Sequence, residues 1–99
     1  MNYHIKIMPQ AEQELEDIAY YIALDSPQRA QSFIESLVSS FINTLSVLPE
    51  GGVIHKGDIR KISYKHYTAF YIVKRAEKQV DILHIVNLNK PLSERGVFL

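Results

Sequence analysis

The sequence contains no cysteine, which excludes disulfide bonds, thiolate nucleophiles and thiolate metal sites. A chain without cysteine suits a reducing compartment, so we expect a cytoplasmic protein. No apolar run approaches the length that spans a bilayer, and we expect no membrane partner. The N-terminal stretch MNYHIKIMPQ lacks the long apolar region of a signal peptide and is typical of a β-strand.

The chain has no excess charge of either sign, but its charges are unevenly distributed. Residues 1–50 carry seven acids and two bases, whereas residues 51–99 carry nine bases and four acids, which gives −5 and +5. The split favours an anionic partner for the C-terminal half. The alternative is that acids decorate exposed helices and bases decorate an exposed sheet.

The chain is long enough for one core: its 99 residues are 46% hydrophobic, so we expect a single domain over residues 1–99. Alternating apolar residues predict a strand over about residues 2–8. Helical spacing of apolar residues predicts a helix over about 10–24. Ser26 as N-cap and Pro27 as first helical residue predict a second helix, which ends at Pro49 and the Gly51–Gly52 pair.

Three further strands are predicted over about residues 58–64, 67–75 and 79–88, with short turns between them. The expected order is β-α-α-β-β-β, an α+β fold. The N-terminal helical hairpin would pack on one face of a mainly antiparallel four-stranded sheet. Residues 89–99 would form a C-terminal tail.

The predicted hairpin of residues 58–74 interleaves cations with aromatic residues. This pattern indicates a basic docking surface, although an ordinary solvated sheet face carries similar residues. For each tyrosine, packing in the core is the alternative to contact with a partner.

Several segments together resemble the RelE/ParE superfamily of bacterial toxins from type II toxin–antitoxin modules. They are AEQELEDIAYYIALDSPQRAQSFIESL, LPEGG, IRKI, HYTAFYIV and VDILHIVN, which span most of residues 3–88. The stretch DIAYYIA followed by SPQRA and FI is more similar to the ParE-like branch. The resemblance implies a toxin that a cognate antitoxin neutralises, itself partly disordered when free. DNA would be contacted indirectly through that antitoxin.

The resemblance implies two alternative targets. ParE-like members inhibit DNA gyrase, and RelE-like members cleave mRNA on the ribosome. Arg60 and Lys61 match the second-strand cations of the RelE-like nucleases, but Thr68 stands where those enzymes have an arginine. Near the C-terminus, Lys90 keeps one of the positive charges that the RelE-like nucleases have there, and Phe98 stands where they have a tyrosine.

This incomplete set counts against nuclease chemistry, and the resemblance then implies a toxin that acts by binding gyrase, with no catalytic residues. His66 and His84 remain as possible acid–base groups, His84 being interpreted as a packed strand residue. The four histidines are scattered, so we expect no metal, and no cofactor is implied. A third alternative is a degenerate member that binds its antitoxin but poisons nothing. The expected target-binding residues are Arg60, Lys61, Tyr67, Tyr71, Lys90 and Arg95.

Overall fold

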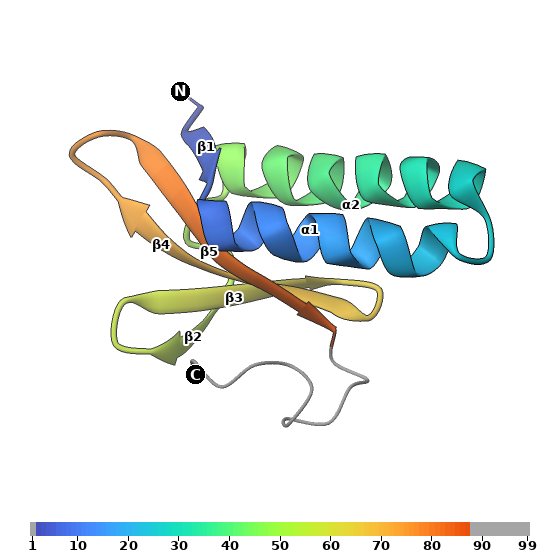
Figure 1. Ribbon diagram of the computed structural model, residues 1–99. Helices are drawn as coiled ribbons and strands as arrows, with labels where there is room; N and C mark the ends of the chain where they lie inside the picture. The colour runs from blue at the N-terminus through green and yellow to red at the C-terminus, as the bar shows by residue number, and fades with distance from the viewer. Residues whose placement is uncertain (1, 88–99) are drawn as a thin grey trace.

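The computed structural model describes residues 2–87, and its elements follow the predicted order with one strand added. They are β1 (His4–Ile7), α1 (Pro9–Ala23), α2 (Pro27–Val47), β2 (Val53–Lys56), β3 (Ile59–Tyr64), β4 (Tyr67–Lys74) and β5 (Gln79–Asn87) (Figure 1). The strands form one sheet in the order β1-β5-β4-β3-β2. β1 is parallel to β5, and the other pairs are antiparallel.

The α+β class and the helical hairpin on one face of the sheet are therefore confirmed, but the sheet has five strands rather than four. The strand that the sequence did not reveal is β2, which has only four residues and forms the edge of the sheet. Glycines flank it on both sides, and Val53 and Ile54 are exposed next to each other rather than alternating with buried positions. A strand with this pattern has the appearance of a loop.

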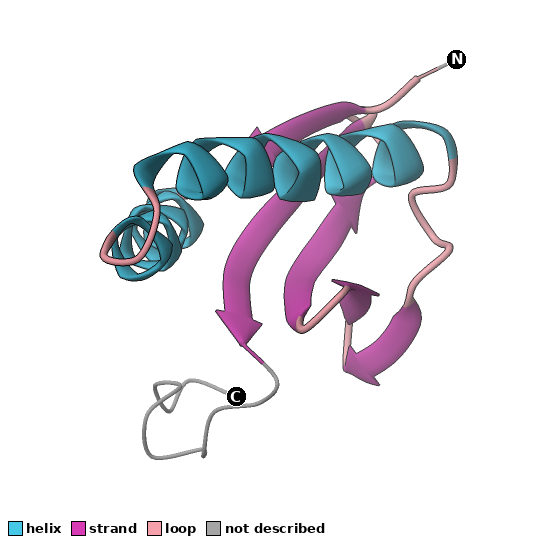
Figure 2. Cartoon of the chain, turned by 90° about the vertical axis from the view of Figure 1, so that its right-hand side faces the viewer, coloured by secondary structure: helices cyan, strands magenta, loops and turns pink. Residues whose placement is uncertain are grey.

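Both helices begin as their sequences predict. Pro9 and Pro27 occupy the first helical position, where the missing N–H costs nothing. The Ser26 hydroxyl caps α2 by accepting a hydrogen bond from the Arg29 backbone N–H at 3.3 Å. The two helices pack against each other on one face of the sheet (Figure 2). The residues of the helices that are buried are Ala11, Leu15, Ala30, Leu37, Phe41 and Leu45.

The core lies between the helices and the middle strands β4 and β5. Tyr71, Ala69 and Val80 are fully buried there. The Tyr71 hydroxyl accepts a hydrogen bond from the Gly52 backbone N–H at 2.9 Å, so the core also fixes the segment that leads into β2. Gly52 approaches so closely that a Cβ at this position would lie 2.5 Å from the Tyr71 hydroxyl oxygen.

A carboxylate from α1 covers part of the edge of β5. β1 ends at Ile7, which pairs with Ile82, so within residues 2–87 no strand lies beside the following residues of β5 on that edge. Glu14 lies there: one carboxylate oxygen accepts the Ile85 backbone N–H at 2.8 Å, and the other lies 3.4 Å from Nδ1 of His84. His84 is thus a packed strand residue, as predicted, but its ring also has a polar partner, Glu14, that the sequence did not indicate.

The helices carry no candidate membrane span: within residues 2–87, none combines the required length with sufficient apolar character.

Candidate functional site

Arg60, the first expected target-binding residue, is half-buried near the start of β3. Its Nη1 atom donates hydrogen bonds to the backbone oxygens of Glu50 at 3.3 Å and Gly52 at 3.0 Å. Arg60 therefore anchors the loop between α2 and β2. A guanidinium has five N–H donors, so this structural role leaves capacity for a partner.

Lys61 lies on the other face of the sheet. Arg60 pairs with Tyr71, whose ring belongs to the core beneath the helices, whereas Lys61 pairs with Phe70. Successive residues of a strand point to opposite faces. The two cations therefore belong to different surfaces, which meet only around the margin of the sheet.

Tyr67 and Tyr71, two of the expected target-binding residues, are buried. Tyr71 is completely buried and Tyr67 is 9% exposed, its ring centroid 5.4 Å from that of Phe33. They face the helices because Tyr67, Ala69 and Tyr71 share the apolar side of β4 that packs against α2. Burial raises the pKa of both hydroxyls above the usual value. The alternative of core packing describes them correctly, and Lys90 and Arg95 lie outside the described residues.

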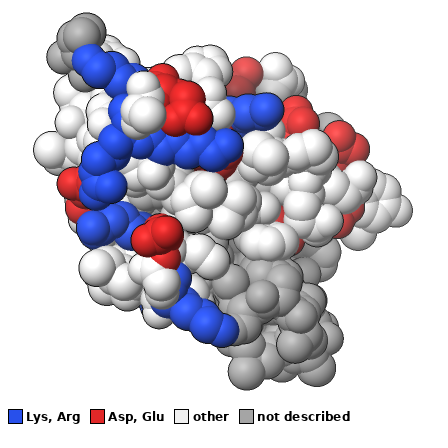
Figure 3. Space-filling view, turned by 90° about the vertical axis from the view of Figure 1, so that its left-hand side faces the viewer, with Lys and Arg blue, Asp and Glu red and all other residues white. Residues whose placement is uncertain are grey.

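Basic residues gather toward one end of the sheet, which we call the cationic end. Its members come from β1, from the β2–β3 hairpin and from the β4–β5 turn, which strand pairing brings together. Figure 3 shows Lys and Arg side chains in a nearly continuous band across this side of the molecule. The residues are Lys6, Lys56, Arg60, Lys61, Lys74, Arg75 and Lys78.

Acids neutralise only part of the cationic end. Lys74 contacts Asp81 at 2.9 Å, and Arg75 forms an ion pair with Glu50. Burial raises the pKa of the Asp81 carboxyl, but hydrogen bonds from Lys74 and Gln79 and nearby positive charges outweigh it, so its pKa lies below the usual value. Asp81 is therefore ionised at neutral pH and stabilises the fold through its ion pair with Lys74. Exposed lysines such as Lys56 supply the positive charge at the surface of the cationic end.

The position where RelE-like nucleases have an arginine holds no cation in this structure. Thr68 is 1% exposed, and its hydroxyl lies 2.9 Å from that of Ser63 on the neighbouring strand. Such a hydroxyl pair provides neither a positive charge nor a group that titrates near neutrality. Among residues 2–87, no three or more His, Asp or Glu side chains are arranged to hold a metal ion.

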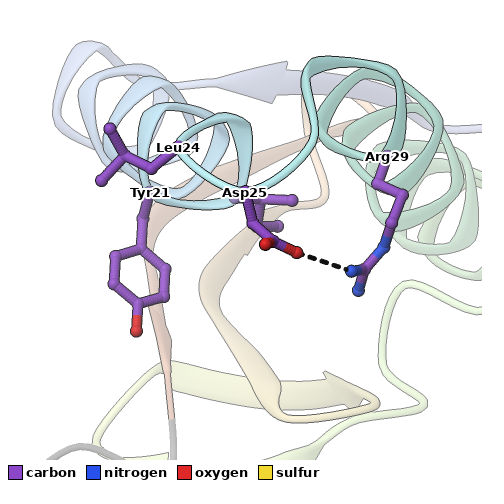
Figure 4. Close-up of a pocket in the computed structure, with 5 residues that line it drawn as sticks. Tyr21, Leu24, Asp25 and Arg29 are labelled. Atoms are coloured by element: carbon purple, nitrogen blue, oxygen red, sulfur yellow. Dashed lines mark hydrogen bonds and ion pairs between the residues drawn. The ribbon is translucent and has the colours of Figure 1, made fainter.

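At the opposite end of the molecule, a groove runs between the N-terminal half of α2 and the β3–β4 turn. We call it the hairpin groove; its volume is about 730 Å³. A smaller hollow of about 380 Å³ shares Ile22 and Arg29 with it, and Figure 4 shows Tyr21, Asp25 and Arg29 around the helical turn. The groove is lined by Ile22, Gln28, Arg29, Ser32, Phe33, Ser36, Tyr64, Lys65, His66 and Tyr67.

Sequence reasoning missed the hairpin groove because its walls come from segments about 30 residues apart in the sequence. Ser36 reads as a solvent-facing helix residue and His66 as an exposed turn residue when each is considered alone. The only available signal was the turn sequence Lys65–His66 between two tyrosines.

Comparison with known proteins identifies the fold and the family. A family described as the ParE toxin of the type II toxin–antitoxin system parDE matches residues 5–88. The chain belongs to the ParE toxin family. No curated protein sequence matches it.

Solved structures of ParE and RelE toxins share the fold at low sequence identity. The chromosomal ParDE toxin–antitoxin system of P. aeruginosa is 19% identical with a TM-score of 0.72, covering 88% of this chain and 97% of that one. The toxin–antitoxin complex RelBE2 of Mycobacterium tuberculosis is 16% identical with a TM-score of 0.66, covering 88% and 92%. The isolated E. coli RelE toxin is 14% identical with a TM-score of 0.64, covering 93% and 90%. The family match over residues 5–88 confirms the ParE-like assignment, and the solved structures show the shared fold.

Proposed function

We propose that this ParE family member is a toxin that inhibits DNA gyrase by binding it and that a cognate antitoxin neutralises the toxin. The observation that carries the proposal is the match to the ParE toxin family over residues 5–88. The buried Thr68 supports binding rather than RNA cleavage, because metal-free cleavage needs cations for the scissile phosphate and groups that transfer protons.

The cationic end is the surface that we assign to the target. It concentrates exposed positive charge, and gyrase with its DNA is an anionic assembly that such a surface attracts. Within this surface, Lys61 is better suited to target contact than Arg60. The Arg60 guanidinium already donates hydrogen bonds to backbone oxygens of the loop between α2 and β2, and replacing Arg60 would disturb the fold.

The test is a supercoiling assay with purified toxin, gyrase, relaxed plasmid and ATP. We expect inhibited supercoiling and accumulation of cleaved DNA. Lys61→Gln should weaken inhibition several-fold, because it removes one positive charge from the cationic end. Lys65→Gln removes one charge at the opposite end of the sheet and is the matched control, which should inhibit like the wild type.

Unaffected supercoiling with no cleaved DNA, at toxin concentrations well above those of gyrase, would overturn the proposal. A parallel arm with translating ribosomes and a reporter message would then show whether the protein cuts mRNA instead. If neither gyrase nor message is affected, the protein is a family member without toxic activity.

A further inference from the structure

The face of the sheet opposite the helices carries lysines from three strands. In β1, Ile5 and Ile7 pack against the core, so Lys6 between them points to the opposite face. Lys6 pairs with Asp81 of β5, and the Lys74 ammonium group of β4 contacts the same carboxylate at 2.9 Å. Lys6 and Lys74 therefore lie on either side of Asp81 on one face of the sheet.

Lys61 continues this arrangement onto β3. It pairs with Phe70, which shares a face of β4 with Lys74, whereas Tyr71 belongs to the core beneath the helices. We call Lys6, Lys74 and Lys61 the lysine row; all three belong to the cationic end, whose charge forms the band in Figure 3. Neighbouring strands lie about 4.8 Å apart, so the row from β1 to β3 extends over about 14 Å.

The acid within the lysine row does not face a partner. Asp81 is 2% exposed, and its carboxylate accepts a hydrogen bond from Gln79 in addition to its contact with Lys74. The side chain of Lys74 is still 43% exposed. Asp58 and Glu77 lower the net charge of the cationic end, but they lie in the turns beside the row. The row thus presents ammonium groups to solvent while its carboxylate is buried.

The lysine row is better suited to phosphates than to a protein surface. Protein interfaces are centred on aromatic and aliphatic side chains, and lysine is depleted there. Phe70 beside Lys61 is only 5% exposed, and the His55 ring lies against it with 4.9 Å between ring centres. Val53, which pairs with Lys61, is exposed but adds a single aliphatic side chain. Lysines without an aromatic anchor are typical of contacts to a nucleic-acid backbone.

A duplex fits this surface better than a single strand does. Single-stranded DNA and RNA bind largely by stacking their bases on exposed aromatic rings. Among residues 2–87, the exposed tyrosines are Tyr20 and Tyr21, and both belong to α1 on the other side of the sheet. The grooves of duplex DNA are about 6 Å and about 12 Å wide, so a row of about 14 Å can contact phosphates on both strands.

We propose that the lysine row binds the phosphate backbone of duplex DNA directly and without sequence preference. Each lysine would contact one phosphate, so the toxin would contact the DNA that gyrase holds as well as gyrase itself. This inference rests on the proposed function for its setting, the complex of gyrase with DNA. It adds a direct contact to the indirect one, through an antitoxin, that the resemblance implies.

Fluorescence anisotropy of a short labelled DNA duplex, with purified toxin and no gyrase, tests the inference. Titrations at several KCl concentrations up to about 150 mM give the slope of log K against log[KCl], which is about −0.9 for each phosphate contact. We expect a slope between about −2 and about −3 for the wild type, because the row has three lysines. Two duplexes of unrelated sequence should bind with equal affinity.

Single substitutions identify the surface that binds. Lys6→Gln and Lys61→Gln should each make the slope shallower by about one and weaken binding several-fold at low salt. Lys61→Arg keeps the charge and should keep the wild-type slope. Lys65→Gln removes the same charge from the β3–β4 turn and is the matched control, which should bind like the wild type. Lys74 is left unchanged because it neutralises the buried Asp81, and thermal melts confirm that each variant folds.

The inference is overturned if the wild type does not bind the duplex at about 30 mM KCl, where phosphate contacts are strongest. Equal weakening by Lys65→Gln and Lys6→Gln, or tighter binding of single-stranded RNA than of the duplex, would overturn it too. The supercoiling assay is read separately. A toxin that inhibits gyrase but does not bind free duplex keeps the proposed function and loses this inference, whereas one that binds duplex and leaves gyrase unaffected does the reverse.

Discussion

Replacing Gly52 with alanine is expected to destabilise the protein strongly, although the change adds a single methyl group next to an edge strand. The new Cβ would lie 2.5 Å from the Tyr71 hydroxyl, 2.6 Å from the Lys61 backbone oxygen and 2.8 Å from Cγ2 of Ile62. Two of these atoms are held by the core or by strand pairing, so the β2 segment has to move instead.

The magnitude follows from two costs. Forcing a methyl group into a packed site costs about 1–3 kcal/mol. Moving the segment also breaks the buried hydrogen bond from the Gly52 N–H to Tyr71, which adds about 1 kcal/mol. We therefore expect a total loss of about 2–4 kcal/mol in the free energy of unfolding. For a chain of this size, that corresponds to a melting temperature lower by roughly 10–25 °C.

Urea and thermal unfolding followed by circular dichroism would measure the loss. Gly51→Ala is the matched control. A Cβ at position 51 would lie 3.2 Å from its nearest neighbour, the Leu48 backbone oxygen, so the substitution should cost much less. In a double-mutant cycle, Tyr71→Phe removes the closest clashing atom, so the two changes together should cost less than the sum of each alone. A Gly52→Ala protein within about 0.5 kcal/mol of the wild type would refute the packing of this segment over Tyr71.

Two further predictions concern carboxylates that serve the fold. Glu14→Ala should cost about 1–3 kcal/mol in the free energy of unfolding because it leaves the Ile85 N–H without its acceptor. Glu14→Gln keeps an oxygen there and should cost clearly less, and equal losses in urea unfolding would count against this role. Because the pKa of Asp81 is lower in the folded than in the unfolded chain, its contribution is present above about pH 4 and is lost as the pH falls below that value. Asp81→Asn removes the charge that pairs with Lys74, so the urea midpoint should decline less steeply between about pH 5 and about pH 3 than in the wild type, and parallel curves would contradict the assignment.

The helices could be predicted from the sequence because their signals are local. Pro9, Ser26 and Pro27 mark helix starts within a few residues of where the structure begins α1 and α2. The family and its α+β order also followed from short segments. β2 could not be predicted in the same way, because its pairing with β3 and the closeness of Gly52 to Tyr71 depend on contacts between distant residues.

The candidate site was harder to predict for a related reason. Alternation along β4 separates its residues into two faces, but both faces are rich in apolar residues, so the pattern does not say which one the helices cover. The sequence therefore left target contact and core packing as alternatives for Tyr71, and the packing of α2 places it in the core. The hairpin groove likewise exists only after α2 and the β3–β4 turn have come together.

The parallel pairing of β1 with β5 joins His4 to Gln79, nearly the two limits of the described chain. A nascent polypeptide that has not yet reached Gln79 cannot complete this pair, and its first strand has no native neighbour. The sheet therefore cannot be completed before β5 has been synthesised. Fragments that end before β5 lack both the partner of β1 and the partner of β4 on that side of the sheet.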